Sequence, residues 1–185
     1  AFEGIDTTWG RVRGGAGVGR LLAEAERLYD AREPSRILPK LLEAHAAMRG
    51  LGADPWVEVK RRELPAAIRS ASGLWLEAIA ASPSATPGSA FRLKVTALVR
   101  AGAPATLARV AVPWGAGEGV PSGAELKLNE PVSGSASVPV PVDAETTQPH
   151  WLRSRPSRGL YAVPEAKDSI RPDGASLRVS FDVVM

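Results

Sequence analysis

The chain contains no cysteine among its 185 residues. Disulfide bonds, thiolate zinc sites and cysteine nucleophiles are therefore excluded from its chemistry. Long apolar runs are also missing, because no stretch approaches the roughly 18 residues that a membrane-spanning helix needs. No signal peptide is visible at the start of the sequence. We therefore expect no membrane-spanning segment.

Catalytic motifs are missing as well. His45 and His150 are the only histidines, and neither lies in an H-E-x-x-H or similar zinc spacing. The serines include no G-x-S-x-G turn and no S-x-x-K pair. We expect His45 to pack in a core, because it falls on the apolar face of the second predicted helix. The sequence thus predicts no metal site and no catalytic constellation in this chain.

The charge balance is moderately basic and evenly spread. Twenty-three Lys and Arg against 20 Asp and Glu give a net charge of +3, and the pI is about 9.6. Acidic and basic residues alternate in the front half, as on solvated helix faces, and no block of five or six basic residues occurs. This pattern does not favour a nucleic-acid partner. A hydrophobic fraction of 44% is typical of a globular protein.

Apolar residues recur every three to four positions in the front half, as in amphipathic helices. We predict a first helix over residues 20–31 and a second over residues 35–50. Asp54 before a proline predicts the N-cap of a third helix. This third helix is expected to run over residues 55–81, with a bend at Pro65 and with Trp75 in the core.

Glycines precede the first predicted helix, at positions 14, 15, 17 and 19. Backbone N–H groups at a helix N-terminus can bind phosphate. However, the spacing does not fit G-x-G-x-x-G, and no Gly-Lys-Ser/Thr follows. We interpret this segment as a flexible loop.

A linker rich in Ser and Pro, residues 83–88, separates a helical segment, residues 1–82, from a second domain, residues 89–185. Beyond the linker the apolar period becomes two, and residues 91–99 alternate as a half-buried strand does. Other strand candidates are bounded by Pro and Gly turns. They are residues 105–113, 125–129, 135–142, 159–163 and 176–184.

These patterns predict an α+β protein. About three N-terminal helices would be followed by an antiparallel immunoglobulin-like β-sandwich. The strand at residues 135–142 should lie at a sheet edge, because Pro139 and Pro141 lack a backbone donor.

Three motifs carry a family resemblance. They are residues 4–9 (Gly-Ile-Asp-Thr-Thr-Trp), 71–78 (Ala-Ser-Gly-Leu-Trp-Leu-Glu-Ala) and 147–153 (Thr-Gln-Pro-His-Trp-Leu-Arg). Together they resemble the region that follows the catalytic domain in large bacterial proteins of the PIG-L/LmbE-like family of zinc-dependent sugar N-deacetylases. The family's catalytic signature, a His-Pro-Asp-Asp-Glu run, is absent here. The motif residues that we expect to be structural are Asp6, Trp9, Trp75, Gln148, Pro149 and Trp151.

The resemblance implies that this chain is a non-catalytic accessory region, cut out of a longer deacetylase. Its partner would be the catalytic domain in cis, which would hold the zinc, so that this chain needs no cofactor and is not itself an enzyme. An exposed apolar patch on the helices would mark the contact with that domain. From the resemblance to this family we expect a location outside the cytoplasm, either in the periplasm or secreted. The alternatives are a free-standing carbohydrate-binding or protein-interaction module.

Aromatic and cationic residues of the second domain are the candidates for carbohydrate binding. A flat aromatic ring can stack on a sugar, and arginines suit an anionic group on a ligand. Packing at a domain edge and solvated loop charge are the alternatives for the same residues. The candidates are Trp114, Trp151, Arg153, Arg155 and Arg158.

Overall fold

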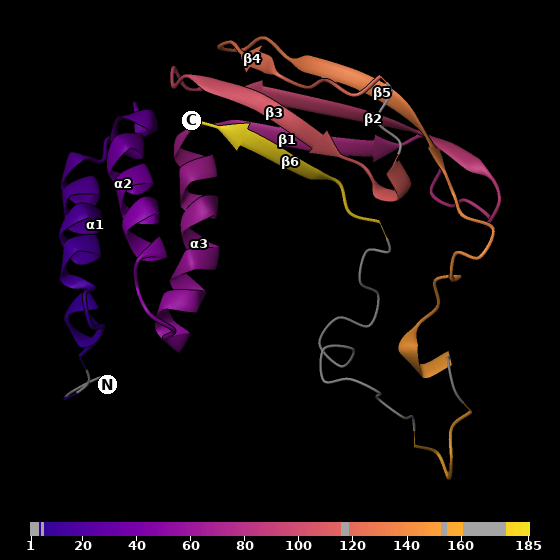
Figure 1. Ribbon diagram of the computed structural model, residues 1–185, viewed down its shortest axis with the longest axis horizontal. Helices are drawn as coiled ribbons and strands as arrows, with labels where there is room; N and C mark the ends of the chain where they lie inside the picture. Colours follow the sequence, from indigo (N-terminus) through magenta and orange to yellow (C-terminus); the bar gives the residue numbers. More distant parts are fainter. Residues whose placement is uncertain (1–3, 5, 116–118, 153–154, 161–176) are drawn as a thin grey trace.

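The computed structural model describes residues 4, 6–115, 119–152, 155–160 and 177–185. Within these residues it has three α-helices followed by six strands in two antiparallel sheets (Figure 1). The prediction of a mixed α and β protein is therefore confirmed at this level. The helices are α1 (Ala16–Leu28), α2 (Leu38–Arg49) and α3 (Pro55–Ala71). The strands are β1 (Leu74–Ala80), β2 (Ala90–Val99), β3 (Ala105–Ala111), β4 (Ala124–Leu126), β5 (Val132–Pro139) and β6 (Ser180–Val184).

The three helices form a layer at one end of the strands, with α2 between α1 and α3 (Figure 1). Their apolar stripes meet in one core, in which Val18, Ala44 and Met48 are at most 1% exposed. His45 on α2 is half-buried. The 3–4 spacing of the apolar residues thus places one face of each helix against its neighbour.

Polar groups at the helix ends find partners inside the layer. The Asp54 carboxylate accepts hydrogen bonds from the backbone N–H groups of Trp56 at 2.8 Å and Val57 at 3.3 Å, which confirms the predicted N-cap. Arg61 on α3 donates to the Met48 carbonyl at the end of α2, at 2.7 Å from Nη2. These bonds satisfy groups that a helix leaves unpaired at its two ends.

The glycine-rich opening is not a flexible loop, so that interpretation is wrong. Helix α1 starts at Ala16 and includes Gly17 and Gly19. A Cβ atom on Gly19 would lie 3.0 Å from the Cβ of Trp9, which belongs to the 3-10 helix η1 (Trp9–Arg11). Close packing of Trp9 on α1 therefore explains the glycine at position 19.

The third helix ends ten residues earlier than predicted, because α3 stops at Ala71 and residues 74–80 form β1. Gly73 between them has φ = +61°, a left-handed conformation that favours glycine after a helix C-terminus. Its carbonyl accepts a hydrogen bond from the Arg100 N–H at 3.1 Å, which starts the pairing of β1 with β2. The expectation that Trp75 lies in the core is also wrong, since its side chain is 48% exposed.

The six strands form two sheets with the orders β1-β2-β5 and β4-β3-β6. Their inner faces share one core, which includes Phe91, Val95 and Val99 of β2 and Leu107 of β3. The predicted alternation along β2 is confirmed. The partly buried Met185 packs against both this core and the helical core, so the helices and the sheets are in contact through the last residue of the chain.

The other predicted strands are matched in part. Strand β5 lies at an edge of its sheet, which confirms the expectation drawn from its prolines. The candidate at residues 125–129 corresponds to the short β4, and the one at 176–184 to β6. Most of the candidate at 159–163, and residue 176, lie outside the described residues.

Candidate functional site

The outer face of the β1-β2-β5 sheet carries an unusual group of side chains. Trp75 is 48% exposed and Ile79 is 52% exposed, both on β1. Leu98 of β2 lies directly opposite Trp75 in the strand pairing. Alternation along β2 brings cations to the same face, and the Arg100 guanidinium lies 5.8 Å from the centre of the Trp75 ring. We call this surface the cationic face: Trp75, Ile79, Arg92, Lys94, Leu98 and Arg100.

The cationic face carries an excess of positive charge. Among the described residues, none of the ion pairs involves Arg92, Lys94 or Arg100. Glu77 is the carboxylate on the outer side of β1, where it lies opposite Thr96 of β2. The Thr96 hydroxyl is hydrogen-bonded to that of Ser133 on β5, at 3.1 Å. An aromatic ring, cations and hydroxyl groups thus share one sheet surface, which suits a polar ligand with a flat apolar side.

A second feature lies beside this face, where the edges of the two sheets meet. Strands β1 and β6 are both edge strands, and a groove with a volume of about 570 Å³ runs between them. Most of its lining residues have apolar side chains, and Arg69 of α3 adds a charged residue to the lining. We call it the edge groove, and the residues that matter for its chemistry are Arg69, Leu76, Ala78, Ala80, Phe91 and Phe181.

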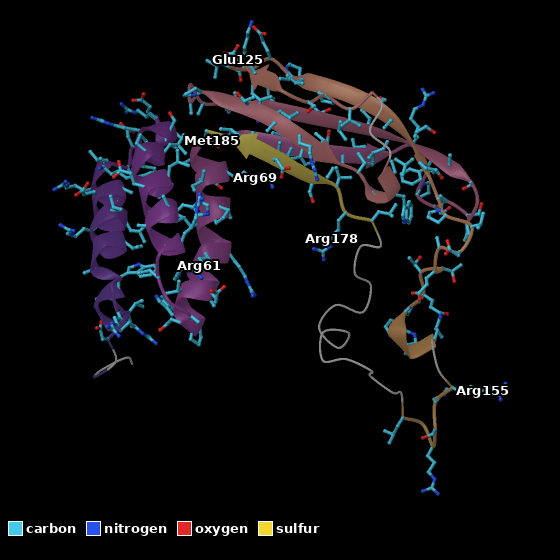
Figure 2. All side chains as sticks on the ribbon, viewed as in Figure 1. Arg61, Arg69, Glu125, Arg155, Arg178 and Met185 are labelled. Carbon is cyan, nitrogen blue, oxygen red and sulfur yellow. The ribbon has the colours of Figure 1, made fainter. Side chains whose placement is uncertain are left out.

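Trp114 lies on a different segment from the other predicted ligand residues that the structure describes. Trp114 lies in a short turn (η3, Pro113–Gly115) after β3 and is 42% exposed. Trp151 is half-buried in η4 (His150–Leu152), within a segment that extends away from the sheets in Figure 1. Arg155 is exposed and lies far out on the same segment (Figure 2). Arg158 is exposed and belongs to the same segment, and Arg153 lies outside the described residues.

The motif residues near the N-terminus have local structural contacts. The Asp6 carboxylate accepts hydrogen bonds from the Thr8 hydroxyl at 2.7 Å and from the Thr8 N–H at 2.8 Å. The bond from the Thr8 side chain is the main reason why the pKa of Asp6 is lowered from its usual 3.8. Thr8 in turn caps η1 through its hydroxyl, which accepts from the Gly10 N–H. These contacts hold Trp9 in place against α1.

The later motif is more exposed. Gln148 is exposed and Pro149 is half-buried, and the Pro149 carbonyl accepts a hydrogen bond from the Leu152 N–H at 3.0 Å. This bond closes the turn that contains Trp151. The motif therefore forms a compact turn of its own rather than a part of the paired sheets.

Candidate metal ligands do not gather in the described part of the chain. Within it, no cluster of three or more His, Asp or Glu side chains is placed so that it could hold a metal ion. Nor does any helix in the described ranges combine the length and apolar character that crossing a bilayer requires.

Sequence reasoning missed the cationic face because it assigned residues 74–80 to a helix. A usable signal was present, since Leu74, Leu76 and Ala78 alternate with Trp75 and Glu77 directly after a glycine. No protein-family model, curated protein or solved structure matches this chain.

Proposed function

We propose that this chain is the non-catalytic accessory region of a PIG-L/LmbE-like sugar N-deacetylase, and that its cationic face binds the sugar chain on which the enzyme acts. The motifs at residues 4–9, 71–78 and 147–153 support the first part. The packing of two antiparallel sheets around one core supports an immunoglobulin-like sandwich as the carrier of this face. The zinc and the catalytic groups would belong to the catalytic domain.

The observation that carries the proposal is the exposure of Trp75 on a sheet surface. A tryptophan that is 48% exposed, with a half-buried leucine opposite it, offers a rigid apolar platform. Sugar rings have one apolar side and a rim of hydroxyl groups, and they stack on such platforms. Thr96 and Ser133 lie on the same surface and can exchange hydrogen bonds with those hydroxyl groups.

The charges on this surface predict whether the acetylated or the deacetylated sugar chain binds better. Arg92, Lys94 and Arg100 outnumber Glu77 on the cationic face. An N-acetylglucosamine chain is neutral, whereas its deacetylated product carries ammonium groups that these cations repel. The face would therefore hold the acetylated substrate and release the product.

Calorimetric titration with N-acetylglucosamine hexamer and with glucosamine hexamer tests this directly. We expect the acetylated hexamer to bind more tightly, and Trp75→Ala to weaken its binding at least about tenfold, because truncation of a central aromatic anchor removes about 1.4 kcal/mol or more. Trp114→Ala is the matched control, because Trp114 has a similar exposure but lies elsewhere. Equal binding by both variants, or no binding of either hexamer, would refute the role of this face.

The accessory role has a separate test in the source DNA. We expect the reading frame to continue upstream of Ala1 and to encode a His-Pro-Asp-Asp-Glu segment. A stop codon, or a start codon directly before Ala1, would instead identify a free-standing module.

Packing against the catalytic domain is the second candidate for the same surface. Large exposed apolar side chains are few in the helical layer, where we expected the contact. They are Val59 on α3 and Tyr29 directly after α1. Trp75 and Ile79 are both exposed on the same face of β1. Deacetylation by the full-length enzyme separates the two candidates, because Trp75→Ala should raise KM if the face binds sugar. A loss of protein stability with KM unchanged is expected if it packs against the catalytic domain.

A further inference from the structure

The edge groove has the backbone arrangement of a strand-binding site. The Ala81 N–H donates to the Arg92 carbonyl at 2.8 Å, and the Arg100 N–H donates to the Gly73 carbonyl at 3.1 Å. In an antiparallel ladder the hydrogen-bonded pairs alternate with non-bonded pairs. The odd-numbered residues of β1 therefore bond to β2, and the N–H and C=O groups of its even-numbered residues point to the free edge.

One of these edge groups already has a partner. The Leu74 carbonyl accepts a hydrogen bond from Nε of Arg69 at 3.3 Å. Among the described residues, β1 pairs with no strand other than β2, so the backbone groups of Leu76, Ala78 and Ala80 have no strand partner. Such a row of unpaired groups is a template for another strand.

The side chains of the same residues face the groove. Leu76, Ala78 and Ala80 line it from β1, and Phe181 lines it from β6. At its deep side the groove reaches Phe91, which is 7% exposed and belongs to the core. An incoming strand with apolar residues at every second position would pair with the edge and cover this part of the core at once.

Two arginines on segments that border the groove favour acidic flanks on that strand. Arg69 lies at the end of α3 next to β1, and exposed Arg178 lies between the groove-lining Leu177 and Val179 (Figure 2). In the described ion pairs neither arginine takes part, whereas Asp182 on β6 is paired with Arg109 at 3.6 Å. Glu77 lies on the outer side of β1 and disfavours acidic residues in the middle of the strand.

We propose that the edge groove binds an extended segment of a partner protein, with alternating apolar residues and acidic residues at its ends, which adds to β1 as a further strand. This proposal does not depend on sugar binding, because the cationic face and the free edge of β1 are different surfaces. The bound segment would extend the sheet to four strands and would place its acidic ends near Arg69 and Arg178.

A synthetic peptide of about nine residues tests the proposal. It alternates valine and serine, carries glutamates at both ends, and is labelled with fluorescein for anisotropy measurements. We expect saturable binding, which falls at least tenfold when lysines replace the glutamates and which disappears when alternate peptide nitrogens are methylated. Equal binding of the methylated peptide, or no binding at 1 mM, would overturn the proposal.

Two protein variants locate the binding. Ala78→Pro removes an N–H that points to the free edge and leaves the bonds to β2 intact, so it should abolish peptide binding. Ser137→Pro makes the same change on the other edge of the sheet, where the bond from the Val140 N–H to the Ser89 carbonyl shows that odd-numbered residues of β5 point outward. It should leave peptide binding unchanged. An equal loss of peptide binding in both variants would count against a peptide partner. Dimerisation of the protein alone in sedimentation experiments would also count against it, and would indicate that a second copy occupies the groove.

Discussion

The helical layer and the paired sheets both have a well-buried centre, but they differ at their margins. The helices pack Ala44, Met48 and Val57 at no more than 1% exposure. The sheets also have a well-buried centre. Along β1, however, solvent exposure increases from buried Leu74 to exposed Ala80. The two parts thus have equally buried centres, and they differ at the edge of the sheets, where β1 is open.

This difference follows from how the backbone hydrogen bonds are formed in each part. The backbone N–H and C=O groups of a helix bond to one another within the helix. Only the groups at its two ends need other partners, such as Asp54 and Arg61. An open sheet has two edges, and those of β1 and β6 lie next to each other without a covering strand among the described residues. Binding functions are therefore expected on the sheets and structural ones on the helices.

The largest expected loss of stability is at the centre of the sheets, and a much smaller loss is expected at their open edge. Leu107 is 1% exposed, so Leu107→Ala should lower the free energy of unfolding by about 3 kcal/mol through lost burial and a new cavity. Leu76 borders the edge groove, so Leu76→Ala should cost less than about 1 kcal/mol. Urea denaturation measures both values. Equal losses would mean that the groove is as well packed as the core.

A smaller loss of stability is expected from a substitution at Gly73, where α3 is followed by β1. Gly73→Ala would place a Cβ at 3.0 Å from the Cβ of Arg100 and would impose φ = +61° on alanine, at a cost of about 1–3 kcal/mol. Gly17→Ala is the matched control, because Gly17 lies inside α1 with open space at its Cβ position. Alanine there should stabilise the protein by about 0.5–1 kcal/mol. Thermal unfolding of both variants would contradict this account if the two changes had the same sign.

Arg61 links α3 to the end of α2 in the helical layer. Its guanidinium donates to the Met48 carbonyl at 2.7 Å and to the Leu51 carbonyl at 2.8 Å, and pairs with Glu58. Arg61→Met keeps most of the apolar stem but loses these bonds, so we expect a loss of about 1.5 kcal/mol in urea denaturation. Arg62→Met on the exposed side should change stability by less than about 0.5 kcal/mol. A similar small change in both variants would show that Arg61 does not stabilise the end of α2.

Elements with a single strong local signal could be predicted from the sequence. Asp54 before proline located the start of α3, Gly50 located the end of α2, and the strict alternation from Phe91 to Val99 located β2. In each case the local preference agrees with the tertiary packing. The predicted α+β class follows from these elements.

Residues 74–80 could not be assigned as surely, because their pattern fits two periods. Leu74, Trp75 and Ile79 have the spacing of a helix stripe, whereas Leu74, Leu76 and Ala78 alternate as in a strand. The pairing with β2 decides between them, and that partner lies beyond the linker. For the same reason, the separation of Trp114 from Trp151 depends on tertiary structure that no local motif encodes.

The smallest expected effect concerns the motif at the start of the helical layer. The Thr8 hydroxyl, followed by the Thr8 N–H, lowers the pKa of Asp6 from 3.8 by hydrogen bonding to the carboxylate. A carboxyl group with a lowered folded-state pKa stabilises the fold above pH 3.8, and this contribution is lost as the pH falls through the folded-state value. In a carbon-13 NMR titration, Thr8→Val should move the pKa of Asp6 back toward 3.8, whereas Thr8→Ser should keep it low. An unchanged pKa in Thr8→Val would assign the shift to the backbone N–H and to Arg11 instead, and would leave the Thr8 side chain only its bond to Gly10 at the start of η1.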